Sequence, residues 1–138
     1  MRDLRVIEVA GGVAGAYCAR LFAVTGADVV LVEPPGGAPS RTHGPHLTAA
    51  DGTARSALHE HVDAGKRSVT IDLDGPDGDA VLAWADVVVA TCDDACPVVP
   101  RRRYVSWQLP DPKGLPLTNV RRIRDEIARR VELLAGEL

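Results

Sequence analysis

The chain has 138 residues, of which 46% are hydrophobic and 25% charged, and its net charge is −3. This length suits one domain, and the weak charge argues against nucleic acid or an anionic membrane as a partner. No apolar run reaches the roughly 18–20 residues of a membrane span, and charges interrupt the first apolar stretch, unlike in a secretory signal. Three cysteines do not make a disulfide framework, so we expect a cytoplasmic protein.

The predicted elements alternate between strand and helix along the chain. Apolar runs rich in β-branched residues predict five strands, at residues 4–9, 28–33, 68–73, 86–90 and 103–109. Apolar residues spaced three or four apart predict helices at residues 13–25 and about 117–134, and Pro76 stands at the start of a short helix predicted at residues 77–85. This alternation predicts an α/β fold: a Rossmann-like three-layer sandwich whose mostly parallel sheet of about five strands has the order 3-2-1-4-5.

Two stretches do not fit regular structure. Residues 34–65 are rich in Pro, Gly, His and Ala and predict one long loop, which in a small domain is functional or mobile. Residues 91–102, TCDDACPVVPRR, form the second. We expect no metal site, because His59 and His61 have no thiol or carboxylate at ligand spacing and are interpreted as solvated loop residues.

The run VIEVAGGVAG, residues 6–15, predicts a strand, a glycine turn and a helix. A dinucleotide fingerprint places glycines where this chain has Ala10, Gly12 and Gly15, and a ribose-binding acid at the end of the next strand, where this chain has Glu33. The first glycine is missing, and two prolines make a stiff exit after Glu33. The alternative is that Gly12 and Gly15 let the helix pack close to the sheet.

Longer motifs carry a family resemblance. AGAYCARL, GADVVLVEPPGG and GKRSVTIDL, within about residues 3–90, resemble the N-terminal part of the class III CoA-transferase family. The resemblance implies half of a Rossmann-like domain that binds coenzyme A or an acyl-CoA. By position, it places the turn of Gly12, Val13 and Ala14 beside the thioester arm of the cofactor.

The same resemblance places Lys66 and Arg67 near the adenosine and phosphate end of coenzyme A, where cationic side chains neutralise phosphate charge. We expect both side chains to lean into a crevice at the carboxyl edge of the sheet. The family's catalytic aspartate, which carries the acyl group, has no assignable counterpart here. The resemblance therefore implies a truncated module that binds a CoA thioester without transferase activity, and a homodimer is one assembly left open.

Residues from about 85 to 138 resemble another family. ADVVVATCDDACPVVPRRRYVSWQLPDP and the helix that follows are similar to the C-terminal part of arsenate reductases with the low-molecular-weight tyrosine phosphatase fold. By position, Asp111 falls on the general-acid loop, and Cys92 and Cys96 fall on a segment with thiol chemistry. The nucleophile loop Cys-x5-Arg is absent, since no arginine stands six positions after Cys18, which we interpret as a buried small hydrophobe.

Three interpretations stay open. The first is a CoA-binding module, and the second is an arsenate-reductase-like or phosphatase-like protein that uses Asp111, Cys92 and Cys96. The third is an inert scaffold, a natural or engineered chimera in which segments 1–90 and 85–138 meet at the fourth strand of one domain, 1–138. The spacing of Cys92 and Cys96 permits a disulfide without requiring one, and a structural or incidental role is favoured.

Overall fold

The computed structural model describes residues 2–9, 12–90, 103–107, 109–110, 112 and 114–137. Five strands form the main sheet in the order β5-β2-β1-β6-β7, and all four pairings are parallel. Their bounds are Arg5–Glu8 for β1, Asp28–Glu33 for β2, Arg67–Thr70 for β5, Val87–Ala90 for β6 and Arg103–Ser106 for β7. These five are the predicted strands, and their order 3-2-1-4-5 is confirmed once the two unpredicted strands β3 and β4 are left out of the count.

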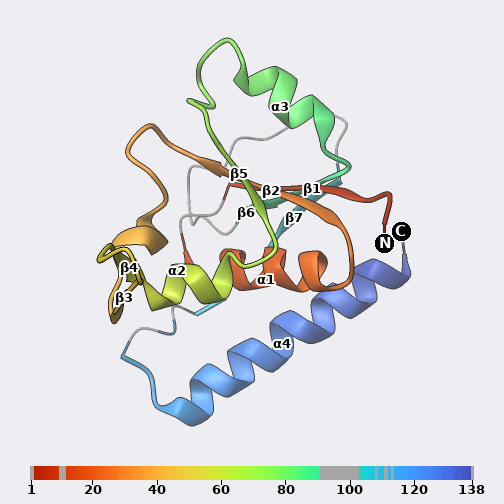
Figure 1. Cartoon of the computed structure of the whole chain (residues 1–138). Coiled ribbons are helices and arrows are strands. Elements are labelled where there is room, and N and C mark those ends of the chain that lie inside the picture. The colour runs from red at the N-terminus through yellow and green to blue at the C-terminus, as the bar shows by residue number, and fades with distance from the viewer. Residues whose placement is uncertain are drawn as a thin grey trace.

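Helices cover both faces of this sheet, as a three-layer sandwich requires. Three of the described helices form these outer layers: α1 (Val13–Val24), α3 (Gly78–Trp84) and α4 (Leu117–Gly136). Figure 1 shows α1 on one face with α4 packed beneath it, and α3 on the opposite face. The predicted α/β sandwich is therefore confirmed.

Two apolar clusters fill the space between the layers. Successive strand residues point to opposite faces, so the strands β1, β2 and β6 each contribute to both clusters. On the α1 face, the buried members are Val6, Cys18, Ala19, Phe22, Ala27, Val29, Val87, Val89, Ile127, Val131 and Leu134. On the α3 face, they are Ile7, Val30, Val32, Leu82, Ala85 and Val88. Burial on both faces explains why β2 and β6 read as nearly continuous apolar runs.

The predicted long loop at residues 34–65 is wrong, because this stretch contains four short elements. They are the 3-10 helix η1 (Pro39–Thr42), the antiparallel hairpin of β3 (His46–Thr48) and β4 (Ala54–Ser56), and the helix α2 (Ala57–Val62). Ser56 caps α2 by accepting a hydrogen bond from the His59 N–H at 3.1 Å. Each element has three to six residues and most of them are exposed, so no apolar periodicity marks them in the sequence.

The second irregular stretch, residues 91–102, lies outside the described residues. Among the helices that are described, none combines the length and the apolar character needed to cross a membrane.

Candidate functional site

Two acidic side chains lie at the carboxyl edge of the parallel sheet, the edge where open α/β sheets bind ligands. Glu8 ends β1 and Glu33 ends β2, and these residues are 0% and 2% exposed. Alternate residues of a strand point to the same face. Glu8 lies two residues after Val6, and Glu33 lies four residues after Val29. Both valines belong to the apolar cluster on the α1 face, so both carboxylates lie on that face. A buried carboxylate needs a cationic or hydrogen-bonding partner, and each has one.

Lys66 is the partner of Glu8. Its Nζ donates to Glu8 Oε2 at 2.6 Å, to Asp63 Oδ1 at 2.7 Å and to the Ala16 carbonyl at 2.8 Å. These contacts use all three N–H donors of the ammonium group, and the Lys66 side chain is 1% exposed. Lys66 therefore ties the end of β1 to the first turns of α1 and to the residue that follows α2.

Glu8 is not fully compensated by this contact. Burial raises the pKa of the Glu8 carboxyl to about 7, against the opposing effect of Lys66. Its Oε1 atom has no hydrogen-bond partner among the residues that the structure describes. A buried, half-satisfied carboxylate is thus held directly before the glycine turn.

Glu33 is compensated completely. The Arg41 guanidinium donates to both carboxylate oxygens at 2.6 Å, the Ala38 N–H donates to Oε2 at 2.8 Å, and the Ser68 hydroxyl donates to Oε1. These hydrogen bonds, that of Arg41 first, lower the pKa of Glu33 to about 2. Because both oxygens are engaged, the geometry gives no support to Glu33 as a ribose-binding acid.

The glycine turn leads into the N-terminus of α1. Gly12 is the capping residue, with φ −119° and ψ 160°, and no side chain of the described residues caps the helix. Gly12 and Val13 are exposed and Ala14 is half-buried. The first intrahelical bond runs from Ala16 N to Gly12 O at 3.1 Å, which leaves the N–H groups of residues 13–15 without a helical acceptor. Their partial positive charge suits an anion or a carbonyl oxygen.

The expected placement of Lys66 and Arg67 is wrong. Lys66 points inward, because buried Glu8 and Asp63 engage its ammonium group. Arg67 begins β5 level with Val30 of β2, and its side chain reaches back to Asp28 at the amino edge of the sheet, away from the glycine turn. Its guanidinium donates to Asp28 at 2.9 and 2.7 Å and lies 5.4 Å from the ring centroid of Trp84. Neither side chain therefore leans into a crevice at the carboxyl edge.

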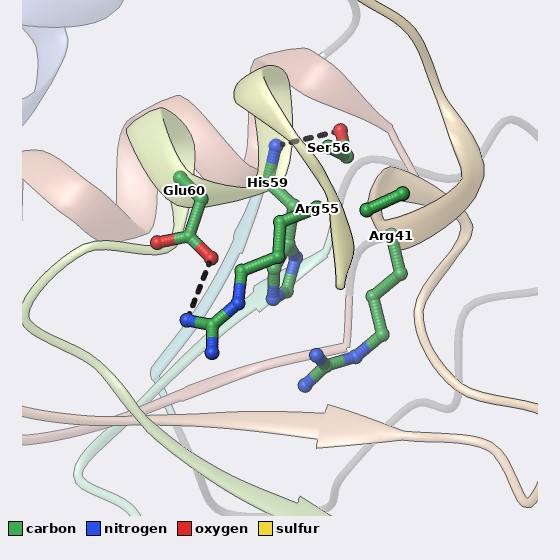
Figure 2. Close-up of a pocket in the computed structure, with 6 residues that line it drawn as sticks. Arg41, Arg55, Ser56, His59 and Glu60 are labelled. Carbon is green, nitrogen blue, oxygen red and sulfur yellow. Dashed lines mark hydrogen bonds and ion pairs between the residues drawn. The ribbon is translucent and has the colours of Figure 1, made fainter. Parts of the chain in front are cut away.

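A pocket of about 430 Å³ lies beside this edge, next to the hairpin and α2. Its lining residues are Arg41, Ala54, Arg55, Ser56, His59 and Glu60. In Figure 2 the guanidinium groups of Arg41 and Arg55 point to the same side, with the His59 ring between them in this view. The pocket therefore combines cationic and hydrogen-bonding groups from η1, β4 and α2.

The remaining candidates have separate outcomes. Cys18 is confirmed as a buried thiol at 0% exposure, and burial raises its pKa to about 12. Cys92, Cys96 and Asp111 lie outside the described residues.

His59 lies in α2 with its side chain 15% exposed, so its interpretation as a solvated loop residue is wrong, whereas His61 is exposed. Within the described ranges, no group of three potential metal ligands comes together.

Sequence reasoning missed the partners of the buried acids. Glu8 interrupts an apolar strand, and such a buried charge requires a cation. Lys66 is 58 residues away from Glu8, so the sequence signals the need without identifying the partner. Arg41 follows Glu33 by eight residues and stands four positions after the motif GADVVLVEPPGG. Arg55 carried no signal, since its neighbours in space come from a hairpin that was not predicted.

Comparisons with known proteins match both parts of the chain. The sequence profile described as CoA-transferase family III matches residues 1–96. The succinyl-CoA:mesaconate CoA-transferase of Haloarcula hispanica is 42% identical over 92 residues, which cover 63% of this chain and 23% of that protein. A crystal structure of a CAIB/BAIF family protein from Brucella suis is 34% identical with a TM-score of 0.57, covering 65% of this chain and 25% of that one.

A relative of a different kind also matches. Arsenate reductase 1 of Staphylococcus epidermidis is 30% identical over 92 residues, which cover 61% of this chain and 70% of that protein. The chain thus spans 23% of the length of the Haloarcula transferase but most of the length of the reductase. Both resemblances seen in the sequence are confirmed.

Proposed function

Since the chain belongs to CoA-transferase family III and is also a relative of the arsenate reductases, we propose that it binds coenzyme A or an acyl-CoA at the carboxyl edge of its sheet. The observation that carries this proposal is the open N-terminus of α1. Gly12 and Val13 are exposed there, within the segment that the family profile matches. Backbone N–H groups at this position suit the thioester carbonyl or a phosphate oxygen.

In this proposal Lys66 is a positioning residue and does not touch the cofactor. Its ammonium group fixes Glu8, directly before the turn, and the Ala16 carbonyl, in the first turns of α1. The two anchor points flank the glycine turn on both sides. Holding them together orders the N–H groups of the turn before a ligand arrives, which lowers the entropic cost of binding.

We further propose that this chain binds the thioester without transferring its acyl group. Transfer through a carboxylate needs an accessible nucleophile near the thioester. Glu8 and Glu33, the carboxylates that end β1 and β2, are buried and held by Lys66 and Arg41. Neither has the exposure that an acyl acceptor needs.

Calorimetry with coenzyme A and succinyl-CoA tests the proposal with two matched variants of one helix. Val13→Glu places an anion at the open N-terminus of α1, where Val13 is 40% exposed, and we expect it to abolish heat release. Val24→Glu makes the same change at the other end of α1, where Val24 is 71% exposed, and we expect wild-type binding. Absence of heat from the wild-type protein at millimolar ligand would favour the inert scaffold instead.

The arsenate-reductase relative supports a second candidate function. The match covers 70% of the arsenate reductase, whereas the match to the Haloarcula transferase covers 23% of that protein. Cys18 does not supply the nucleophile, because it is fully buried and its thiol pKa is raised to about 12. Reduction of arsenate or hydrolysis of p-nitrophenyl phosphate that disappears in Cys92→Ser or Cys96→Ser would establish this function.

A further inference from the structure

We propose that the pocket of Arg41, Arg55 and His59 is a binding site for a small oxyanion, separate from the glycine turn. The shared chemistry is a carboxylate or phosphate group that accepts hydrogen bonds from guanidinium N–H groups. Arg55 is the principal contact, and Arg41 and His59 complete the site. The proposal does not depend on CoA binding at α1, since its site and its probes are different.

Arg55 has no tight partner among the residues described. Its nearest acidic atoms are Glu60 Oε1 at 3.8 Å and Asp51 Oδ2 at 4.0 Å, both beyond hydrogen-bond distance. All three side chains are about half exposed, so these ion pairs hold little energy. An oxyanion that accepts two hydrogen bonds from the Arg55 fork makes a stronger contact than either of them.

Arg41 is fixed in place by its partner. Its Nε and Nη2 donate to Glu33, which is buried, while the Arg41 side chain is 46% exposed. A guanidinium group has five N–H donors, and the pair with Glu33 engages the N–H groups of Nε and Nη2. Among the described residues no hydrogen bond or ion pair engages Nη1, and Arg41 lines the pocket. Arg41 is therefore a preorganised donor that needs no rearrangement to meet a ligand.

His59 is oriented in a similar way. Its Nδ1 lies 2.8 Å from Asp63 Oδ2 and 2.9 Å from Ser40 Oγ, and the Ser40 hydroxyl itself donates to the same Asp63 oxygen. This arrangement makes Nδ1 the donor to Asp63, so Nε2 of the neutral ring is an acceptor. The two guanidinium groups therefore supply the donors of the site, and His59 forms part of its wall. Asp63 also accepts from Lys66, so the ring is anchored to the buried network behind it.

The test is titration of the full chain with inorganic phosphate and with succinate, followed by NMR of the arginine Nε–H signals and by calorimetry. We expect one or both probes to shift the Arg41 and Arg55 signals. Arg55→Gln should weaken binding about tenfold or more, as expected for loss of a charge-assisted contact. Glu60→Gln should tighten it, because a competing carboxylate is removed. Arg121→Gln, the same charge change at an exposed residue of α4, should leave binding unchanged.

The two probes also distinguish the source of the oxyanion. Binding of phosphate alone identifies a phosphate site, and binding of succinate alone identifies a site for the free carboxylate of a dicarboxylic acid. Succinyl is the acyl group named for the Haloarcula transferase, which makes succinate an informative probe. Binding of neither probe, or binding that Arg55→Gln leaves intact, overturns the proposal. Because neither probe contains coenzyme A, a failure here is distinct from a failure of CoA binding.

Discussion

Ion pairs stand at both edges of the same parallel sheet, but in opposite environments. At the carboxyl edge, Lys66 and Glu8 are each 1% exposed in their side chains. At the amino edge, Arg5 pairs with Asp86 at 2.8 Å and Arg67 pairs with Asp28 at 2.7 Å, with side chains 34–63% exposed. The distances are similar, so distance alone does not separate the two groups.

The difference lies in what each pair costs when it is broken. Water replaces a lost partner at the exposed edge, whereas a buried charge has no replacement. The carboxyl edge therefore concentrates charge that the fold holds at a cost in stability, beside the open helix terminus and the arginine pocket. Such concentration is typical of functional sites, while the amino edge serves to join strand ends.

The largest expected effect comes from Lys66→Met. Removing the ammonium group leaves Glu8 and Asp63 buried without their cation, which should cost about 3–5 kcal/mol in the free energy of unfolding. Urea denaturation followed by circular dichroism measures this loss. Adding Glu8→Gln to Lys66→Met should recover part of it, because one uncompensated charge disappears. A loss below about 1 kcal/mol would mean that water reaches this network.

The next effect is a pH dependence of opposite sign for the two buried acids. Glu8 has a folded-state pKa of about 7, above its usual 4.5. Its contribution to the free energy of unfolding therefore falls by up to about 3 kcal/mol as the pH rises from 4.5 to 7. Glu33 has a folded-state pKa of about 2, so its contribution is present above pH 4.5 and is lost as pH falls toward 2. Stability attributable to these two groups should therefore be greatest near pH 4.5 to 5.

Unfolding experiments along a pH series check this pattern. Glu8→Gln should flatten the decline above pH 4.5 and leave the acid side unchanged. Glu33→Gln should act on the acid side instead, since it removes the carboxylate that Arg41 holds. Unchanged slopes in both variants would show that other groups control the pH dependence.

The sheet was predictable from sequence and the site was not, for physical reasons. Strands such as DVVLVE have continuous apolar runs because both faces are buried, and this signal is local. The inward direction of Lys66 depends on Glu8, 58 residues earlier, and on Asp63 after an unpredicted helix. The motif GKRSVTIDL identified the family, but adjacent Lys66 and Arg67 serve opposite edges of the sheet. Sequence position alone does not show that division.

The smallest expected effect comes from the amino edge, and it completes the comparison with Lys66. Arg67 pairs with Asp28 and lies over Trp84, but its side chain is 63% exposed. Arg67→Met removes one positive charge, as Lys66→Met does at the adjacent position, and water then solvates the freed Asp28. We expect a loss of about 0.5–1 kcal/mol, the usual range for an exposed ion pair with a cation–π contact. The same urea denaturation measures it, with salt reducing the wild-type advantage. Equal losses from the two substitutions would show that burial does not distinguish the edges, and would remove the reason for treating the carboxyl edge as the functional one.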